Sequence, residues 1–345
     1  MILWVVGIAI LALWPTTTSI KYYGYHLDYL EPERTLAIKG IFVMLIFASH
    51  FVGYVELSPS ILNTAYTQFR IYMGQLVVAP FLFYSGYGIT VQVQRRGEQY
   101  VRDFPRNRIR RVFLQFWLAL LLFFIVGCIQ GTRFTAKQLL LSLVGWTSLG
   151  NSNWYVLMII CLYVISYAAF RITRKTLPVL LLVWAGCVAY SLWQKAYGRP
   201  TYCYNTVFAY WIGMFYAYYK EDIDRSIVKK EGTYLAVVLV MLVLFIGLHR
   251  IWKIRTLVYD MVSVCFALLL VLLSSHIQIN NPLLTFIGRH VFSMYILQRL
   301  PMIVLQGTLG RTPGLYFCLT FVLTILLSIL FDRLSKNLYK THRLH

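Results

Sequence analysis

Residues 36–55, LAIKGIFVMLIFASHFVGYV, form an apolar stretch long enough to cross a lipid bilayer, which takes about 20 helical residues. The stretch also contains two ionisable residues, Lys39 and His50. Each would cost several kcal/mol in hydrocarbon unless it faced a partner or a cavity. At about 100° per residue the two lie on nearly the same helix face, with His50 roughly 16 Å above Lys39. The stretch therefore predicts a membrane helix whose polar face lines an active-site cavity.

The whole chain has the composition of an integral membrane protein. Of its 345 residues, 59% are hydrophobic and 13% are charged, and the mean hydropathy is +0.66. A soluble domain has roughly a quarter of its residues charged, so these values predict an all-α, polytopic helical bundle. The net charge of +20 comes from Lys and Arg in short loops between apolar runs, which excludes nucleic acid as the expected partner. The six cysteines lie mostly within apolar runs and have no paired spacing, so neither a disulfide framework nor a metal site is expected.

Apolar segments along the chain indicate the number of membrane spans. We expect about ten core spans and one short N-terminal span, which lacks the basic start and small-residue cleavage site of a signal peptide. The chain then divides into a short span with a cytoplasmic connector (1–35), a membrane domain (36–331) and a basic cytoplasmic tail (332–345). The predicted spans cover residues 2–14, 36–55, 71–93, 112–129, 153–172, 177–194, 205–219, 233–248, 256–275, 290–307 and 314–331.

The basic loops indicate the orientation in the cell membrane. The loop QRRGEQYVRDFPRNRIRR, residues 94–111, holds seven arginines, so the positive-inside rule places it in the cytoplasm together with the C-terminus. Lys39 then lies near the cytoplasmic surface and His50 in the outer half of the membrane. The cations at 249–255 are an exception, because they fall in an outside loop. Residues 138–150 are interrupted by polar residues and glycine, and we expect them along the outer interface or as a re-entrant piece.

His50 is the leading candidate for acid–base chemistry. A neutral imidazole titrates near neutral pH, so it can take a proton from a hydroxyl and return it to a leaving group. The alternative is a histidine that only hydrogen-bonds a neighbouring helix. Asp260 begins a span that runs the other way, at a depth that matches His50, so an Asp–His pair is geometrically possible. The alternative role for Asp260 is an ion pair with Arg255 or Lys253 at the membrane interface.

Arginines in the cytoplasmic loop are candidates for anion binding. Arg108 and Arg111, spaced i and i+3, share one side of a helix. Their guanidinium groups suit phosphates, although membrane topology alone also explains arginines here. Farther along, Gln298 and Arg299 lie in a span just before Pro301, which indicates a polar cavity.

Small residues also interrupt one span. Ser85, Gly86 and Gly88 lie in FYSGYG, residues 83–88, where they allow close helix approach. Several other site types have no sequence support: the chain has no phosphate-binding P-loop, no GxGxxG after a strand, no metal-spaced His or Cys cluster and no GxSxG elbow.

These pieces, in this order, resemble the acyltransferase-3 family of multi-pass membrane acyltransferases. The family's basic residue, ten residues and then histidine match Lys39 and His50. The resemblance covers roughly residues 34–331, with two departures. Lysine replaces the usual arginine at Lys39, and Gln298, followed by Arg299, stands where histidine is common. The further matches are an SGF-like motif (Ser85, Gly86, Tyr87), an R-x-x-R element (Arg108, Arg111), a WxL-type span start (Trp154, Tyr155, Val156, Leu157) and a late glycine–serine–tyrosine segment (Gly288, Ser293, Tyr295).

The resemblance implies transfer of an acyl group, most often acetyl from cytoplasmic acetyl-CoA, to a hydroxyl of a carbohydrate at or beyond the outer face. Lys39, Arg108 and Arg111 would hold the CoA phosphates. His50 would deprotonate the acceptor hydroxyl or carry the acyl group itself, with Asp260 orienting it. Substrate contacts are expected from residues of the later motifs and their neighbours: Ser85, Tyr87, Trp154, Tyr295, Gln298 and Arg299.

Two other function classes fit a polytopic chain. A secondary transporter or flippase for a glycan-related substrate would also have many spans, but proton coupling usually employs mid-membrane acids, which are scarce here. A catalytically silent receptor or assembly partner is the third reading, because Gln298 breaks one motif. The lipid bilayer is the expected environment, no metal is expected, and a homo-oligomer is compatible with the sequence. Tyr and Trp near span ends can stack on sugar rings but are equally expected as interfacial anchors.

Overall fold

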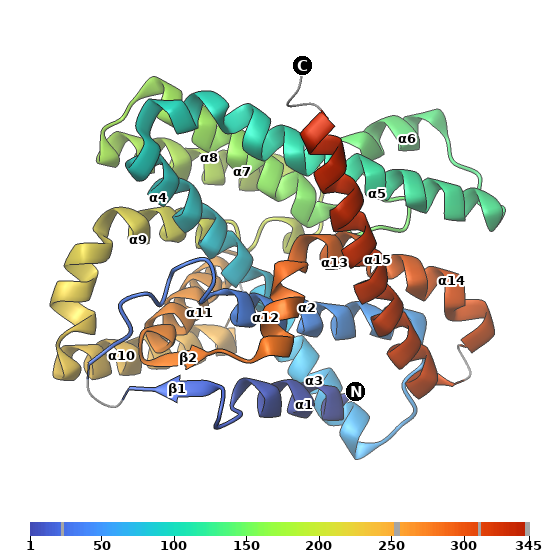
Figure 1. Cartoon of the computed structure of the whole chain (residues 1–345), viewed down its shortest axis with the longest axis horizontal. Coiled ribbons are helices and arrows are strands. Elements are labelled where there is room, and N and C mark those ends of the chain that lie inside the picture. The colour runs from blue at the N-terminus through green and yellow to red at the C-terminus, as the bar shows by residue number, and fades with distance from the viewer. Residues whose placement is uncertain (22–23, 252–255, 310–311, 342–345) are drawn as a thin grey trace.

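The computed structural model describes residues 1–21, 24–251, 256–309 and 312–341 as an assembly of helices with one pair of short strands (Figure 1). The first half of the chain comprises α1 (Ile2–Ala12), β1 (Thr18–Ile20), α2 (Leu36–Phe51), α3 (Ile61–Met73), α4 (Ala79–Phe104), α5 (Arg110–Ile129), α6 (Ala136–Leu143) and α7 (Trp154–Ile172). The second half comprises α8 (Thr176–Ala196), α9 (Phe208–Ile223), α10 (Glu231–Ile251), α11 (Thr256–His276), β2 (Ile277–Ile279), α12 (Pro282–Arg289), α13 (Val291–Leu297), α14 (Arg299–Leu309) and α15 (Pro313–Thr341).

The predicted all-α class is confirmed, and each of the eleven predicted spans falls on one or two helices. Within the described residues, seven helical stretches are long and apolar enough to cross a membrane, and α1 is a shorter apolar helix. The seven are Leu36–Tyr54, Ile61–Ile129, Trp154–Ile172, Thr176–Ala196, Glu231–Ile251, Leu257–His276 and Pro313–Asn337.

Glycines bend the longest of these stretches. Gly74 and Gly97 have φ of +44° and +56°, a backbone conformation that glycine adopts far more readily than other residues. Gly74 separates α3 from the turn before α4, and Gly97 lies within α4. Ile61–Ile129 is therefore a series of kinked segments, as the course of α4 in Figure 1 shows.

Two pairs of glycines bring helices into backbone contact. A Cβ atom added to Gly40 of α2 would lie 2.1 Å from the carbonyl oxygen of Leu284 in α12, and one added to Gly288 of α12 would lie 1.9 Å from that of Leu36. The second pair joins α4 to α9. A Cβ at Gly86 would lie 2.1 Å from the carbonyl oxygen of Tyr210, and one at Gly213 would lie 2.2 Å from that of Phe83. The expectation that Gly86 permits close helix approach is confirmed, whereas a Cβ at Gly88 would meet open space.

Two segments outside the spans take shapes that the sequence did not reveal. β1 and β2 pair antiparallel, with Thr18 opposite Ile279 and Ile20 opposite Ile277, which ties the N-terminal connector to the end of α11. Residues 138–150 form most of α6 and then a polar turn. Trp117 of α5 donates its indole N–H to the Leu143 oxygen and holds α6 in place.

Replacing Gly288 by alanine should destabilise the protein by about 1–3 kcal/mol or more, because the methyl group must push α2 away from α12. The check is the apparent melting temperature of purified protein in detergent. Gly247→Ala is the matched control, since a Cβ at Gly247 in α10 meets nothing within 4 Å. Equal melting temperatures for the two variants would contradict the backbone contact.

Candidate active site

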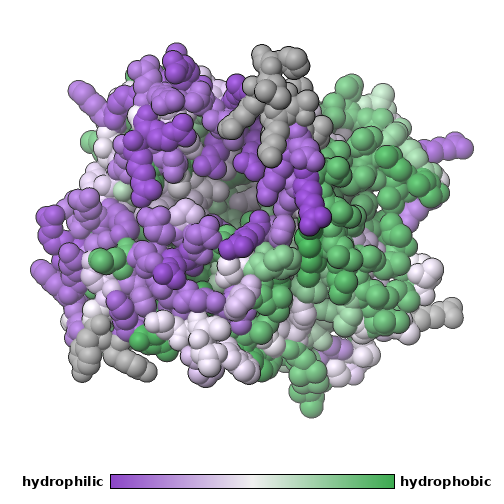
Figure 2. All heavy atoms as spheres, viewed as in Figure 1, coloured by the Kyte–Doolittle hydropathy of each residue, from purple (hydrophilic) through white to green (hydrophobic). Residues whose placement is uncertain are grey.

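A cavity of about 1480 Å³ opens among charged side chains from both ends of the chain. Figure 2 shows hydrophilic residues gathered on one side of the molecule and around a hollow near its centre, with hydrophobic residues over α14 and the lower part of α15. Two acids, Glu31 and Asp332, line the cavity, against ten cations, so it is strongly electropositive and suits a polyanion. The ten cations are Lys39, Arg95, Arg96, Arg106, Arg108, Arg110, Arg111, Arg289, Arg333 and Lys336.

The three residues expected to hold phosphates all line this cavity. Arg108 is half-buried and donates its Nε–H to the Tyr100 hydroxyl at 2.9 Å, which fixes the direction of its guanidinium. Arg111 follows on α5 and is exposed. Lys39 is half-buried, with its Nζ 5.3 Å from the centre of the Tyr84 ring. Their common location agrees with binding of one anion-rich ligand.

The wall above Lys39 is one face of α2. Val43 and Ile46 continue the stripe at steps of four and three residues and line the cavity. Ser85, Tyr87, Tyr155 and Tyr295 line it as well. The cavity therefore rises from the arginines along α2 to a cluster of tyrosines.

His50 is the next residue on this stripe and lies just beyond the cavity lining. Its ring centre is 6.4 Å from that of Tyr295, whose ring lies 5.3 Å from that of Tyr155. The Nδ1 atom of His50 is buried and has no hydrogen-bond partner among the described residues. Tyr295 thus borders both the cavity and the imidazole.

The break between α13 and α14 gathers polar groups near His50. Gln298 is 1% exposed and donates its side-chain amide to the Tyr295 oxygen. Arg299 donates to the Tyr54 hydroxyl at 2.9 Å and lies within electrostatic range of His50. Trp154 packs edge-on against Tyr155, outside the cavity lining.

The structure does not bring Asp260 to His50. Asp260 is 5% exposed, and its Oδ1 has no hydrogen-bond partner among the described residues. It lies within electrostatic range of Cys187 in α8, and no hydrogen bond joins it to His50 among the described residues. The alternative partners, Lys253 and Arg255, fall outside the described residues.

The sequence did not predict an acidic centre that lies at the cavity. Asp332 accepts a hydrogen bond from His290 Nδ1 at 2.5 Å and another from the Ser293 hydroxyl. It lies on α15, which continues as a helix to Thr341, past the predicted start of the basic tail at residue 332, so that Arg333 and Lys336 also line the cavity. Asp332 thereby joins α15 to the start of α13. Its separation of 42 residues from His290 left no local signal.

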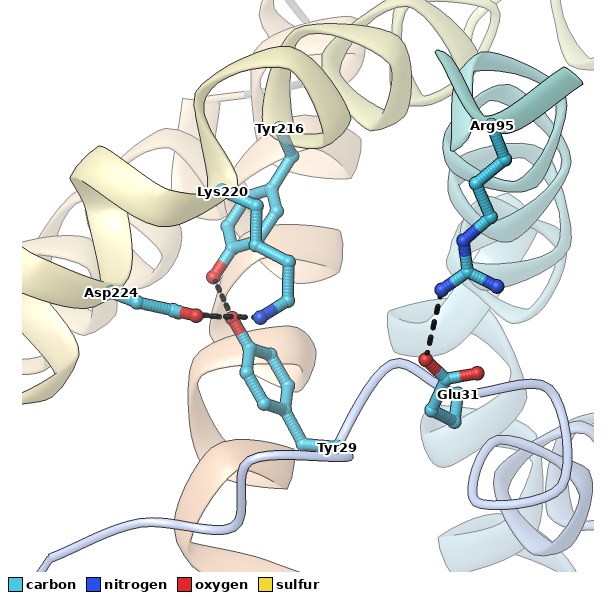
Figure 3. Close-up of polar contacts among 6 residues, drawn as sticks. All are labelled: Tyr29, Glu31, Arg95, Tyr216, Lys220 and Asp224. Atoms are coloured by element: carbon cyan, nitrogen blue, oxygen red, sulfur yellow. Dashed lines mark hydrogen bonds and ion pairs between the residues drawn. The ribbon is translucent and has the colours of Figure 1, made fainter. Parts of the chain in front are cut away.

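Polar contacts fix the connector at the cavity mouth (Figure 3). Tyr29 donates its hydroxyl to Asp224 at 2.7 Å and lies 2.8 Å from the Tyr216 hydroxyl, while Lys220 pairs with Asp224 at 2.5 Å. Beside this cluster, Glu31 pairs with Arg95 of α4 at 3.3 Å. The connector therefore lies between α9 and α4 and contributes Glu31 to the cavity wall.

Residues 36–333 match a family model described as "Acyltransferase domain". The chain belongs to the acyltransferase-3 family. No curated protein and no solved structure matched the chain. Membership makes the protein an acyltransferase with membrane-spanning helices, and such an enzyme requires an acyl donor.

Replacing Asp332 by alanine in this acyltransferase should lower the free energy of unfolding by about 1–3 kcal/mol, because Ser293 and His290 lose their common acceptor. The measurement is thermal unfolding of purified protein in detergent. Asp222→Ala is the control, since Asp222 is exposed and its contact with Arg225 is 3.9 Å long. An Asp332 variant as stable as this control would show that the contacts do not hold α13 to α15.

Proposed function

We propose that this acyltransferase moves an acetyl group from cytoplasmic acetyl-CoA to a hydroxyl of a surface polysaccharide or its lipid-linked precursor. The observation that carries the proposal is the cavity itself, which begins among arginines and follows the α2 face toward His50. Such a path suits a long donor with phosphates at one end and a thioester at the other.

The donor end is assigned to Lys39, Arg108 and Arg111. Guanidinium groups bind phosphate oxygens through two parallel hydrogen bonds, and the lysine adds a point charge. From Lys39 the stripe on α2 extends roughly 16 Å to His50, and an extended pantetheine arm can follow it. Ser85 and Tyr87 line the same passage and are assigned to substrate contact.

The transfer step is assigned to His50. The imidazole takes the proton of the acceptor hydroxyl, whose oxygen attacks the thioester carbonyl carbon. A carbon–oxygen ester bond forms, the carbon–sulfur bond breaks, and the proton passes to the departing CoA sulfur as a thiol. A route through acetyl-histidine gives the same products. In either route the thioester lies beside Tyr295, which lines the cavity and neighbours His50.

The acceptor is assigned to the outer half of the membrane, near Trp154, Tyr295, Gln298 and Arg299. Asp260 has no hydrogen bond to His50, so the proposal gives it no part in proton transfer.

We further propose that the arginine-lined mouth and the C-terminus face the cytoplasm. The shorter helices α9, α13 and α14 then complete about ten core crossings of the cell membrane.

His50→Ala should reduce acetyl transfer at least about 100-fold, the usual contribution of a positioned general base. Purified enzyme in detergent is given radiolabelled acetyl-CoA, and release of labelled acetate or ester is measured together with protein yield. His249→Gln is the control, because His249 packs against Tyr72 at the far end of α10. Substrate movement without acetyl-CoA would instead identify a transporter.

Replacing Arg108 and Arg111 by alanine should raise the KM for acetyl-CoA roughly tenfold or more for each arginine, because charge-assisted hydrogen bonds to phosphate are lost. The kcat should change less. Arg225→Ala is the matched control, since Arg225 is exposed and lies outside the cavity lining. An unchanged KM in the double variant would remove the two arginines from the donor site.

A further inference from the structure

Aromatic rings cluster at the C-terminal end of α8, which is the end farther from the basic loop 171–175. The Trp146 ring lies 5.1 Å from that of Trp193 and 5.5 Å from that of Tyr197, measured between centres. The Arg199 guanidinium sits 4.8 Å above the Trp146 ring. We call these four residues the outer platform. Trp193 and Tyr197 are 38% and 68% exposed, so the rings form an accessible surface with a cation upon it.

The outer platform connects to the surroundings of His50 through the segment after α8, which lies beside α7 (Figure 1). Arg199 lies within electrostatic range of the Cys203 thiol. Cys203 lies within electrostatic range of Tyr295, whose ring is 6.4 Å from that of His50. Tyr202 of the same segment packs against Trp154 at the start of α7, with ring centres 5.8 Å apart. Ring contacts through Trp154 and Tyr155 therefore lead from the platform segment to Tyr295.

Buried polar groups without partners lie beneath the platform. Gln194 is 0% exposed, and neither its Nε2 nor its Oε1 has a hydrogen-bond partner among the described residues. It follows Tyr190 by one helical turn, and Tyr190 donates to the Cys203 oxygen, so both side chains face the segment 199–206. In that segment Asn205 Oδ1 and Thr206 Oγ1 are also buried and unpaired within the described chain. Buried polar atoms are nearly always paired, so this unpaired group marks a polar site beside the platform.

The charge of this region points to the nature of that ligand. No Asp or Glu occurs between Asp103 and Glu221, and among the described residues no carboxylate lies within ion-pair distance of Arg199. A guanidinium fixed on an indole face and left without an anion matches a ligand carboxylate. A lipid phosphate would supply charge but no ring to cover the aromatic surface.

We propose that the outer platform is the acceptor subsite and that it binds an acidic carbohydrate, with the sugar ring on Trp146, Trp193 and Tyr197 and its carboxylate on Arg199. This subsite rests on the proposed acetyl transfer and defines the charge of the acceptor.

The test compares methyl β-glucuronide with methyl β-glucoside, which differ in the carboxylate, as acceptors for purified enzyme with saturating acetyl-CoA. Ester formation should show a KM about tenfold lower for the glucuronide, the gain expected from one charge-assisted hydrogen bond. Arg199→Gln should remove this preference and leave the KM for the glucoside unchanged. Trp193→Ala and Tyr197→Ala should raise the KM for both sugars.

Trp184→Ala is the matched control, because Trp184 is an exposed tryptophan on α8 that packs against Phe208, away from the platform. Acetyl-CoA hydrolysis without a sugar should be the same in all these variants.

Equal KM values for the two sugars, no use of the glucuronide, or an unchanged preference in Arg199→Gln would each overturn the acidic-sugar subsite. Lower melting temperatures for the platform variants at unchanged KM would identify the rings as interfacial anchors instead. Loss of His50-dependent acetyl-CoA hydrolysis from the wild-type enzyme would count against the acetyl transfer itself.

Discussion

Direct contact between helix backbones is the constraint on which the cavity depends. Where α2 crosses α12 and α4 crosses α9, the space available is that of a hydrogen atom, so glycine is required on each helix. The glycines are sequence neighbours of residues in the cavity wall: Lys39 precedes Gly40, Ser85 precedes Gly86, and Arg289 follows Gly288. Packing that brings the backbones together therefore also sets the depth and direction of polar side chains. Shape and chemistry here have a common cause.

The charged side chains of the cavity wall are mostly basic. The cavity has ten basic residues and two acids, and both acids are engaged, Glu31 with Arg95 and Asp332 with His290 and Ser293. The acids thus position wall elements and leave most of the positive charge to a ligand. Arg199 and Arg299 lie instead on the rings of Trp146 and Tyr54. Within the described residues neither cation forms an ion pair with a carboxylate, so both stay attractive to anions.

Regular spacing explains how much could be predicted from the sequence. The stripe from Lys39 to Ile46 follows from helical periodicity, and Arg108 with Arg111 reached the cavity as expected from their spacing. Asp260 was matched to His50 by depth alone, and depth does not determine the rotation of a helix about its axis. The Asp332–His290 contact and the pairing of β1 with β2 join residues far apart in the chain, for which the sequence has no local pattern. The approach of the Tyr295 ring to His50 depends on side-chain rotamers, which no spacing encodes.

That tyrosine has a further consequence for the cell. A passage lined by arginines and open from the cytoplasm to the far surface would conduct small anions and dissipate the membrane potential. Tyr295 lines the cavity and packs beside Tyr155 and His50, so aromatic rings crowd the end of the passage. An acyltransferase with so basic a cavity can thereby keep the bilayer electrically tight.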